Sequence, residues 1–363
     1  MERHILICSF NPGGDAGYDV YRAAGESYEK CGSFMPQVSA GVTVPSDRPG
    51  VLYAADERRG TPDSPYGGGR VYALSFDSRN GVMREINHVR SYGLMPSFCA
   101  PDPTGRYLLV THFGVTDDMD VPKLREEIGE PVPYEGTLVL FRLCDDGSVG
   151  ELLDEVRFPF EDGRATHAHS VRFAPFGDFC LVNEMGTDRL WTFRIEDGRL
   201  LGMEFKCGRG TGPRYSAFHP TEPIVYVNYE EQPYIASFSY DADGTLHKIC
   251  ELRTLNESDT APDDKQSGLA IHPDGRTLYC PMRGKNLVSV VRTDGKGGLT
   301  LVQQIKLSGR RPKDCAVSPD GRTLAVANRE SDSVEFFDIR EDGTLLPTGK
   351  TLEKPRTGFV MFV

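Results

Sequence analysis

Length, charge and composition exclude several classes of protein. The chain has 363 residues, with 41 Lys plus Arg against 53 Asp plus Glu and a net charge of −12. This acidic balance argues against a nucleic-acid binder, which needs a basic surface, but it leaves room for a small basic pocket. The length could accommodate two domains, yet all-β folds of this size often form one, and we expect a single domain over residues 1–363.

The start of the chain and its cysteines indicate the compartment. The sequence begins MERHILICSFNPGG, and no basic stretch is followed by a long apolar run, so neither a secretory signal nor a membrane span is expected. Nine cysteines are scattered through strand-like segments without a CxxC pair. Buried free thiols explain this pattern better than a disulfide or zinc framework. We therefore expect a cytoplasmic protein without membrane contact.

The chain is built from repeated segments of short strands. Residues 4–10, 18–24 and 27–34 read as three strands. Six longer segments then follow, each with an apolar strand, a turn that is often Pro-x-Gly, and a second apolar strand. They begin near Met35, Met95, His167, Gly212, Ser267 and Arg311. Such a repeat is one supersecondary unit that cannot bury its own faces, so the copies must stack.

The repeats predict four strands per copy and a closed ring. Asp-Gly turns separate the strands at 243–244, 274–275, 320–321 and 342–343, and helical periodicity is weak. The last segment, 355–363, is a single strand, which supplies the strand that residues 4–34 lack. Pairing the two ends would remove the exposed sheet edges. The predicted fold is an all-β, seven-bladed β-propeller of four-stranded antiparallel blades.

One segment, about 115–136, interrupts the repeat between the second and third strands of the copy that starts near Met95. Its acidic residues and prolines indicate a loop, with one helical turn at about 122–128. It is either a surface loop or a flap beside the central opening.

Aligned copies can be compared position by position. Six residues before the turn proline, the innermost strand carries Ser97, His169, Arg214, Ser267 and Lys313, and Arg356 is placed at the matching position in the last strand. Innermost strands line the channel of such a ring, so this position should face the axis. We expect His169, Arg214, Lys313 and Arg356 to form a basic pocket.

A second set of titratable residues is expected where the second strand of each copy ends. These residues are Glu57, His112, Glu184, Glu230, Arg283 and Arg329. They should surround one mouth of the channel, next to the first set, and together hold one small ligand. Arg pairs bidentately with carboxylate or phosphate, so an anionic ligand is expected.

Each of these residues has a structural alternative. The Glu and Arg residues of the second set could form ion pairs between blades. His167 and His169 alternate onto the same side of a strand, which favours a site over a structural histidine, and His167 is included among the substrate-binding candidates. A metal held by His167, His169 and Glu184 is conceivable, but no further residue completes it, and we expect no metal or other cofactor.

Several motifs resemble the seven-bladed propeller lactonases. They are HAHS at 167–170 followed by GTDRLWTF, GPRYSAFHP at 212–220, VYVNYE ending at Glu230 and LYCPMRG ending at Gly284. The family includes the cycloisomerase-type 6-phosphogluconolactonases and the fungal 3-carboxy-cis,cis-muconate lactonizing enzymes. The chain departs from the family pattern at Tyr215, Tyr229 and Met282, which leaves the identity of the substrate open.

The resemblance implies a metal-independent reaction at a lactone, with His169, Arg214, Glu230 and Arg283 in the central cleft. For hydrolysis, His169 with a pKa near neutrality would be the general base on water, and Glu230 would orient His169 or the water. The arginines would hold the distal anion and stabilise the oxyanion.

The leading hypothesis is therefore hydrolysis of an anionic sugar lactone, most plausibly 6-phosphogluconolactone. A muconate-type cycloisomerase and a non-catalytic binding propeller are the alternatives. We expect a small anionic substrate, no nucleic acid, no membrane, and a monomer or weak homo-oligomer.

Overall fold

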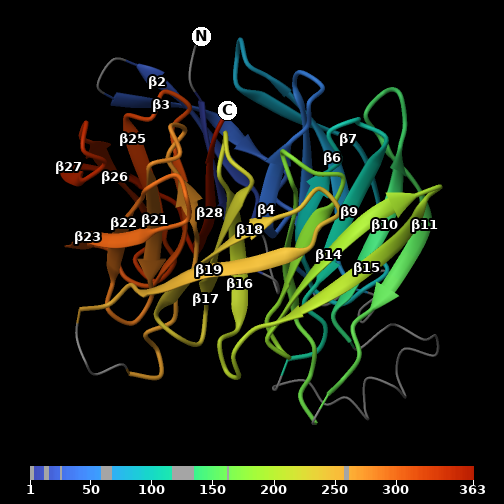
Figure 1. The fold of residues 1–363 in the computed structure, drawn as a ribbon. Helices are drawn as coiled ribbons and strands as arrows, with labels where there is room; N and C mark the ends of the chain where they lie inside the picture. The colour runs from blue at the N-terminus through green and yellow to red at the C-terminus, as the bar shows by residue number, and fades with distance from the viewer. Residues whose placement is uncertain are drawn as a thin grey trace.

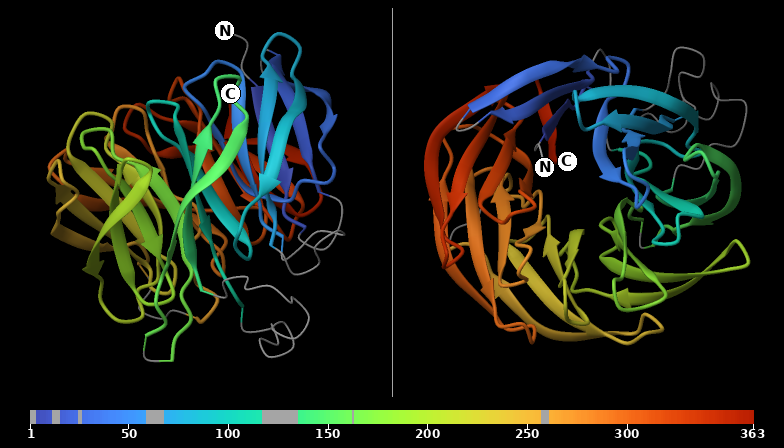
Figure 2. Two further views of the ribbon diagram at one scale, coloured as in Figure 1. Left: turned by 90° about the vertical axis from the view of Figure 1, so that its right-hand side faces the viewer. Right: turned by 90° about the horizontal axis from the view of Figure 1, so that it is seen from above.

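The chain forms a ring of seven antiparallel sheets. The computed structural model describes residues 4–11, 16–24, 27–58, 68–116, 135–161, 163–256 and 261–363. These residues form seven sheets of four strands each, and no helix occurs among them. Figures 1 and 2 show the sheets arranged as blades around a central axis. The predicted seven-bladed β-propeller is confirmed.

The strands follow the order of the chain in every blade but the last, and the first strand of each of blades 1–6 is innermost. Blades 1 to 3 consist of β4 (Ala40–Pro45), β5 (Val51–Asp56), β6 (Arg70–Asp77) and β7 (Val82–Arg90); β8 (Pro96–Pro101), β9 (Tyr107–His112), β10 (Thr137–Leu143) and β11 (Val149–Arg157); and β12 (Ala168–Phe173), β13 (Cys180–Glu184), β14 (Arg189–Glu196) and β15 (Arg199–Lys206).

Blades 4 to 6 consist of β16 (Pro213–Phe218), β17 (Ile224–Tyr229), β18 (Tyr234–Tyr240) and β19 (Leu246–Arg253); β20 (Ala270–Ile271), β21 (Thr277–Met282), β22 (Leu287–Thr293) and β23 (Leu299–Lys306); and β24 (Pro312–Val317), β25 (Thr323–Asn328), β26 (Ser333–Ile339) and β27 (Leu345–Glu353). Blade 7 combines β28 (Thr357–Phe362) with β1 (His4–Ser9), β2 (Tyr18–Ala24) and β3 (Ser27–Phe34).

Blade 7 closes the ring, as predicted from the unpaired last segment. The innermost strand β28 pairs antiparallel with β1, with Leu6 opposite Met361. A buried ion pair between Lys354 Nζ and Asp19 Oδ1, 3.4 Å long, joins the same two ends of the chain. Closure pairs the last strand of the ring with β1, so neither strand is left as an isolated strand at the junction of the two ends.

The turns that punctuate the repeat also connect neighbouring blades. The glycines of the four predicted Asp-Gly turns have positive φ, which favours glycine because it lacks a Cβ. Gly343 belongs to one of these turns. Its carbonyl accepts a hydrogen bond of 3.0 Å from the buried Tyr279 hydroxyl of the preceding blade. Tyr53 makes the same contact with Gly147 at 2.9 Å. The turn sequence therefore sets the packing of one blade on the next.

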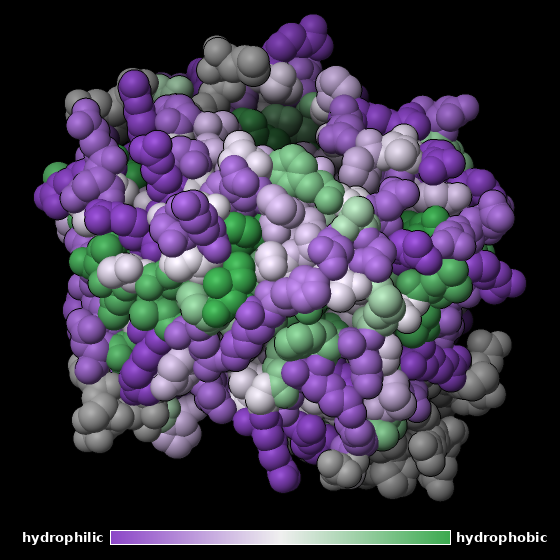
Figure 3. Space-filling model, in the orientation of Figure 1, coloured by the Kyte–Doolittle hydropathy of each residue, from purple (hydrophilic) through white to green (hydrophobic). Residues whose placement is uncertain are grey.

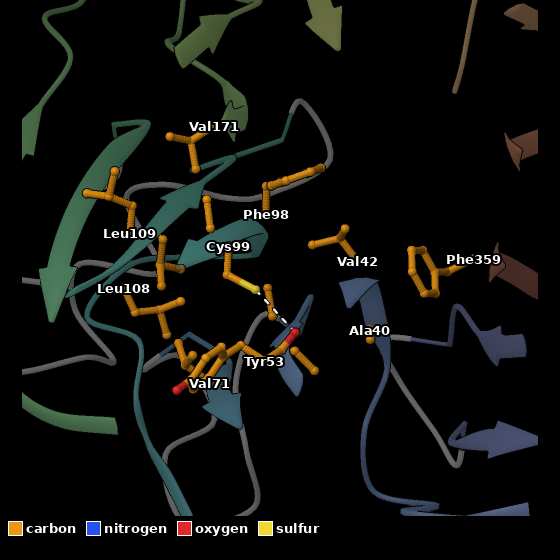
Figure 4. Packing of buried hydrophobic residues seen from close by; sticks show 14 of the residues in the cluster. Ala40, Val42, Tyr53, Val71, Phe98, Cys99, Leu108, Leu109, Val171 and Phe359 are labelled. Atoms are coloured by element: carbon orange, nitrogen blue, oxygen red, sulfur yellow. Dashed lines mark hydrogen bonds between the residues drawn. The ribbon is translucent and has the colours of Figure 1, made fainter. Parts of the chain in front are cut away.

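The core lies between the blades and continues to the axis. Figure 4 shows Phe359, Val42 and Phe98, from the innermost strands of blades 7, 1 and 2, following one another around the ring. All three are at most 6% exposed. The Cys99 thiol lies 3.5 Å from the Tyr53 carbonyl in the same region. Apolar side chains of the innermost strands are therefore part of the buried core.

The surface is predominantly hydrophilic on the face that Figure 3 displays, with apolar groups in smaller patches. No helix able to cross a bilayer occurs in the described residues. All nine cysteines are unpaired thiols, and five of them are buried.

Candidate active site

A β-bulge near the start of the innermost strand positions the first set of predicted site residues. In six blades the pairing of this strand shifts at one place, which inserts an extra residue there. The residues at the bulge are Gly41, Ser97, His169, Arg214, Lys313 and Gly358. The prediction that equivalent positions carry His169, Arg214 and Lys313 is confirmed.

Arg356 does not share this position, which corrects the sequence alignment of the last strand. The bulge of β28 falls at Gly358, because Cys8 pairs with Phe359 and Ser9 with Thr357. Arg356 lies two residues earlier, is exposed, and donates to Asn11 Oδ1 at 2.6 Å. Its φ of 51° matches the 56° of Arg311, which precedes Lys313 by two residues. The alignment of the last strand was therefore wrong by two residues.

The second predicted set mixes two positions that differ by one residue. In three blades the predicted residue comes directly after the residue that pairs with the first residue of the innermost strand. The paired residues are Asp56, Tyr229 and Asn328, and the residues that follow them are Glu57, Glu230 and Arg329. Arg283 likewise follows Met282. His112 and Glu184 are themselves the paired residues. A shift of one residue turns a side chain to the opposite face of a strand.

His112 and Glu184 consequently lie inside their blades and not in the cluster, contrary to the prediction. His112 is fully buried and its Nδ1 lies 2.8 Å from the Thr137 hydroxyl. Burial lowers the pKa of His112 to about 3, so the ring is neutral. The Glu184 carboxylate accepts hydrogen bonds from the backbone N–H groups of His167, Gly186 and Thr187.

Glu230 joins two arginines at the centre of the site. Its Oε2 accepts from Arg214 Nε at 2.6 Å, and its Oε1 lies 2.6 Å from Arg283 Nη2. The side chains of Arg214 and Glu230 are 4% and 10% exposed. The two guanidinium groups hold the pKa of Glu230 well below its usual range, despite burial. Glu230 thus fixes the arginines, and no hydrogen bond to His169 was found among the described residues.

His169 lies beside this ion-pair triad. Its ring centroid is 5.2 Å from that of Tyr215, and the Arg214 guanidinium lies 4.6 Å from the same Tyr215 centroid. His169 Nδ1 is buried without a hydrogen-bond partner in the described part of the chain. Burial, reinforced by Arg214, lowers the pKa of His169 well below its ordinary value. The predicted pKa near neutrality is therefore not what this free site produces.

A second charged pair completes the cluster. Lys313 Nζ lies 3.6 Å from Glu57 Oε2 and 3.1 Å from the centre of the Phe10 ring, and Arg329 lies over the same ring at 4.7 Å. Burial lowers the pKa of Lys313 to about 8, against the opposing effect of Glu57. Gly41 makes this arrangement possible, because a Cβ there would collide with the Glu57 carboxylate.

The sequence reasoning missed two aromatic residues of the site, Phe10 and Phe113. Phe10 follows the end of β1 and Phe113 follows the end of β9, each at the position that Glu57 holds in blade 1. Phe113 stacks on His167 at 4.2 Å and meets His169 edge-on at 6.0 Å, and its carbonyl lies 2.8 Å from His167 Nδ1. Consistent counting from the strand start would have found both; a search for titratable residues could not.

The site has an excess of positive charge. Arg214, Arg283, Lys313 and Arg329 face the two carboxylates of Glu57 and Glu230. Arg214 Nη1 is buried and has no hydrogen-bond partner among the described residues. An unpaired buried donor of this kind is costly unless a ligand satisfies it. The arrangement fits a small anion.

No group of three His, Cys, Asp or Glu side chains is placed to hold a metal ion in the described ranges. The conceivable set of His167, His169 and Glu184 is not assembled, since the Glu184 carboxylate is turned to backbone N–H groups. The predicted insertion, including the helical turn expected at about 122–128, lies largely outside the described residues. Its described end at Gly136 packs against the backbone of His167 and Ala168.

Comparisons with known proteins identify relatives of this chain. Residues 35–362 match the family model described as lactonase, seven-bladed β-propeller. The chain is 26% identical over 300 residues to the 6-phosphogluconolactonase of Bacillus subtilis, covering 80% of each protein. It is 25% identical over 298 residues to the 6-phosphogluconolactonase of Formosa agariphila, covering 79% of this chain and 78% of that one.

Solved structures share the fold over the whole chain. The periplasmic gluconolactonase of Pseudomonas aeruginosa superimposes with a TM-score of 0.85 at 22% identity, covering 100% of this chain and 99% of that one. A protein from Lactobacillus plantarum has a TM-score of 0.83 at 21% identity, with both chains fully covered. The match to the family model spans nearly all seven blades, and the chain belongs to the seven-bladed β-propeller lactonase family.

Proposed function

We propose that the protein hydrolyses an anionic sugar lactone, with 6-phosphogluconolactone as the first substrate to test. Membership of the lactonase family and the relatives named 6-phosphogluconolactonase support the reaction class. The observation that carries the proposal is the pairing of two unsatisfied buried groups, His169 Nδ1 and Arg214 Nη1, in one cationic cluster. A base and an anion-binding donor are what hydrolysis of such a lactone requires.

The reaction assigns one role to each group. His169 takes a proton from water as the water oxygen attacks the lactone carbonyl carbon. Arg214 stabilises the oxyanion that forms, because its Nη1 is buried and has no hydrogen-bond partner among the described residues, so it can donate to the developing charge. The ring C–O bond then breaks, and the imidazolium returns the proton to the leaving alkoxide. Glu230 keeps Arg214 and Arg283 in place for this step.

The low pKa of His169 suggests that the substrate also influences the strength of the base. Burial and Arg214 keep the imidazole neutral, and a neutral imidazole can accept a proton, but a base this weak is inefficient. A bound phosphate or carboxylate would add negative charge beside His169, which favours the imidazolium and raises its pKa. The substrate anion would therefore strengthen the base that attacks it.

The test is hydrolysis of 6-phosphogluconolactone by the parent protein and by His169→Gln. Loss of a general base lowers the rate by about 10²–10⁴-fold. His247→Gln is the control, because His247 is exposed on β19 and pairs only with Asp241, at 2.9 Å, among the contacts found for it. Full activity of His169→Gln would contradict the proposal.

Two other activities are outcomes of the same assay. Arg214 and Arg283 could also hold the two carboxylates of a muconate, so 3-carboxy-cis,cis-muconate belongs in the substrate panel, followed by its ultraviolet absorbance. Conversion of the muconate and not of the lactone would replace the hydrolase by a cycloisomerase. Binding of phosphogluconate that Arg214→Gln abolishes, without turnover of either compound, would indicate a binding protein.

A further inference from the structure

A second cavity lies at the opposite end of the channel from the cluster just described. It has a volume of about 620 Å³. Its walls are formed mainly by residues in the second half of the innermost strands of blades 1 to 5 and just after them. Figure 2 (right) views the ring from this end, since the C-terminus directly follows β28 and lies near the axis there. None of the cluster residues His169, Arg214, Glu230 and Lys313 lines the cavity.

Aromatic rings separate the two ends of the channel. Phe98 lines the cavity, and its ring meets that of Tyr215 at 5.7 Å. Tyr215 in turn contacts His169 and Arg214 on the side of the candidate active site. Phe98 and Tyr215 are 1% and 8% exposed. The cavity is therefore a compartment of its own and not an extension of the lactone site.

The cavity contains one unusual cation, Arg172. At its position, three residues after the bulge, the other blades carry only apolar residues: Val44, Ala100, Ala217, Ala270, Ala316 and Met361. The Arg172 guanidinium lies 5.1 Å from the centre of the Phe98 ring. Its Nε is buried, and no hydrogen bond or ion pair of Arg172 was found within the described ranges.

The charges around Arg172 leave it unneutralised. Asp314 is near enough to influence its pKa, but Asp314 Oδ2 accepts from the Val360 N–H at 3.4 Å and forms no ion pair with Arg172 in the described structure. Asp47 lines the cavity at an exposed position, and His219 Nδ1 faces the backbone N–H groups of Thr221 and Glu222. Burial lowers the pKa of Arg172, yet a guanidinium stays charged in proteins.

Arg172 is half-buried, and its buried Nε has no hydrogen-bond partner in the described part of the chain, which is unfavourable; a carboxylate would satisfy the guanidinium with two parallel hydrogen bonds. With Asp314 nearby and Asp47 in the cavity wall, a single cation matches a monoanion better than a phosphate dianion. The remaining walls come from apolar residues such as Val171, Leu269 and Ile271. We propose that this cavity is a second binding site, which takes a small organic carboxylate with an apolar body.

The test is calorimetric titration with benzoate, using parent protein and two variants. Arg172→Met removes the charge and keeps the length of the side chain; Ala217→Leu keeps Arg172 and fills part of the cavity. Both should weaken benzoate binding at least about tenfold, because a hydrogen bond to a charged group is lost or blocked. The reference is Arg142→Met, because Arg142 is exposed on β10, pairs with Glu151 at 2.8 Å and belongs to neither site, so benzoate affinity should be unchanged.

Folding is checked separately from binding. Arg172→Met should unfold at or above the parental temperature, because it removes a half-buried charge that has no partner in the described structure, and should retain lactone hydrolysis if the parent has it. Absence of benzoate binding to the parent, parental affinity in either cavity variant, or loss of affinity in Arg142→Met would overturn the proposal. These outcomes do not depend on whether the protein is a lactonase.

Discussion

Replacing Glu230 by Gln tests the central claim about the site, that two arginines are held by one buried carboxylate. Both ion pairs are 2.6 Å long, and the Glu230 side chain is only 10% exposed. Removing one partner of a buried pair costs about 3–5 kcal/mol, because the remaining charge stays buried and unpaired. With an unfolding entropy of about 2.1 cal/mol/K per residue, this loss lowers the unfolding temperature by about 4–7 °C.

The neighbouring Glu231 supplies a matched control. Its carboxylate pairs with Lys265 at 2.7 Å, but the two side chains are 39% and 33% exposed. Exposed pairs contribute about 0–1 kcal/mol, so Glu231→Gln should change the unfolding temperature by about 1 °C or less. Thermal unfolding followed by circular dichroism at pH 7 distinguishes the two variants.

The pH dependence gives the same experiment a second readout. The folded-state pKa of Glu230 is lowered, so its contribution to stability is fully present above its ordinary value of 4.5 and is lost as the pH falls towards the folded-state value. The difference in unfolding temperature between the parent and Glu230→Gln should be constant from pH 7 to 5.5 and should shrink below pH 4.5. An equal, small loss in Glu230→Gln and Glu231→Gln would refute the reasoning.

Three further predictions concern binding, packing and closure. The lowered pKa of Lys313, about 8, means that KM for an anionic lactone should rise as the pH increases through 8, and Lys313→Arg should remove that rise; a rise of equal size in both would contradict the assignment. Gly41→Ala should destabilise the fold by about 1–3 kcal/mol in urea titrations, because the new Cβ displaces the Glu57 carboxylate. Gly208→Ala is the control, since a Cβ at Gly208 meets no atom closer than an ordinary contact. Equal urea midpoints for the two variants would refute this. Deleting residues 357–363 removes β28 and should abolish the monodisperse folded protein in gel filtration; a truncated chain that unfolds cooperatively at the parental temperature would show that closure is dispensable.

The sequence contained enough information for the architecture. Alternating apolar residues and Asp-Gly turns set the strands, and the missing first strand of blade 7 was visible as a surplus one after Pro355. These features are local and recur in every copy, so an assignment made in one copy can be compared with the same position in the others. The bulge position that carries His169, Arg214 and Lys313 was found for the same reason.

The details of the site were less predictable, because they depend on single-residue register and on contacts across the ring. His112 and Glu184 were misplaced by one position, and a titratable residue at a strand end gives no local sign of the face it occupies. Glu230 follows β17 and pairs with Arg214 on β16 and with Arg283 after β21, so the triad brings together residues from two blades. Arg172 escaped notice because its lack of a partner is visible only in three dimensions.

The pairing of β28 with β1 has a consequence for biosynthesis. The strand at residues 357–362 is made after all other strands of the ring, so until then one edge of β1 has no partner while the other six blades are already available. Such long-range pairing is slow, and exposed edges are prone to join other chains in the meantime. Glu57 meets Lys313 across the closed ring, so a nascent chain cannot complete the anion site before β28 has been made.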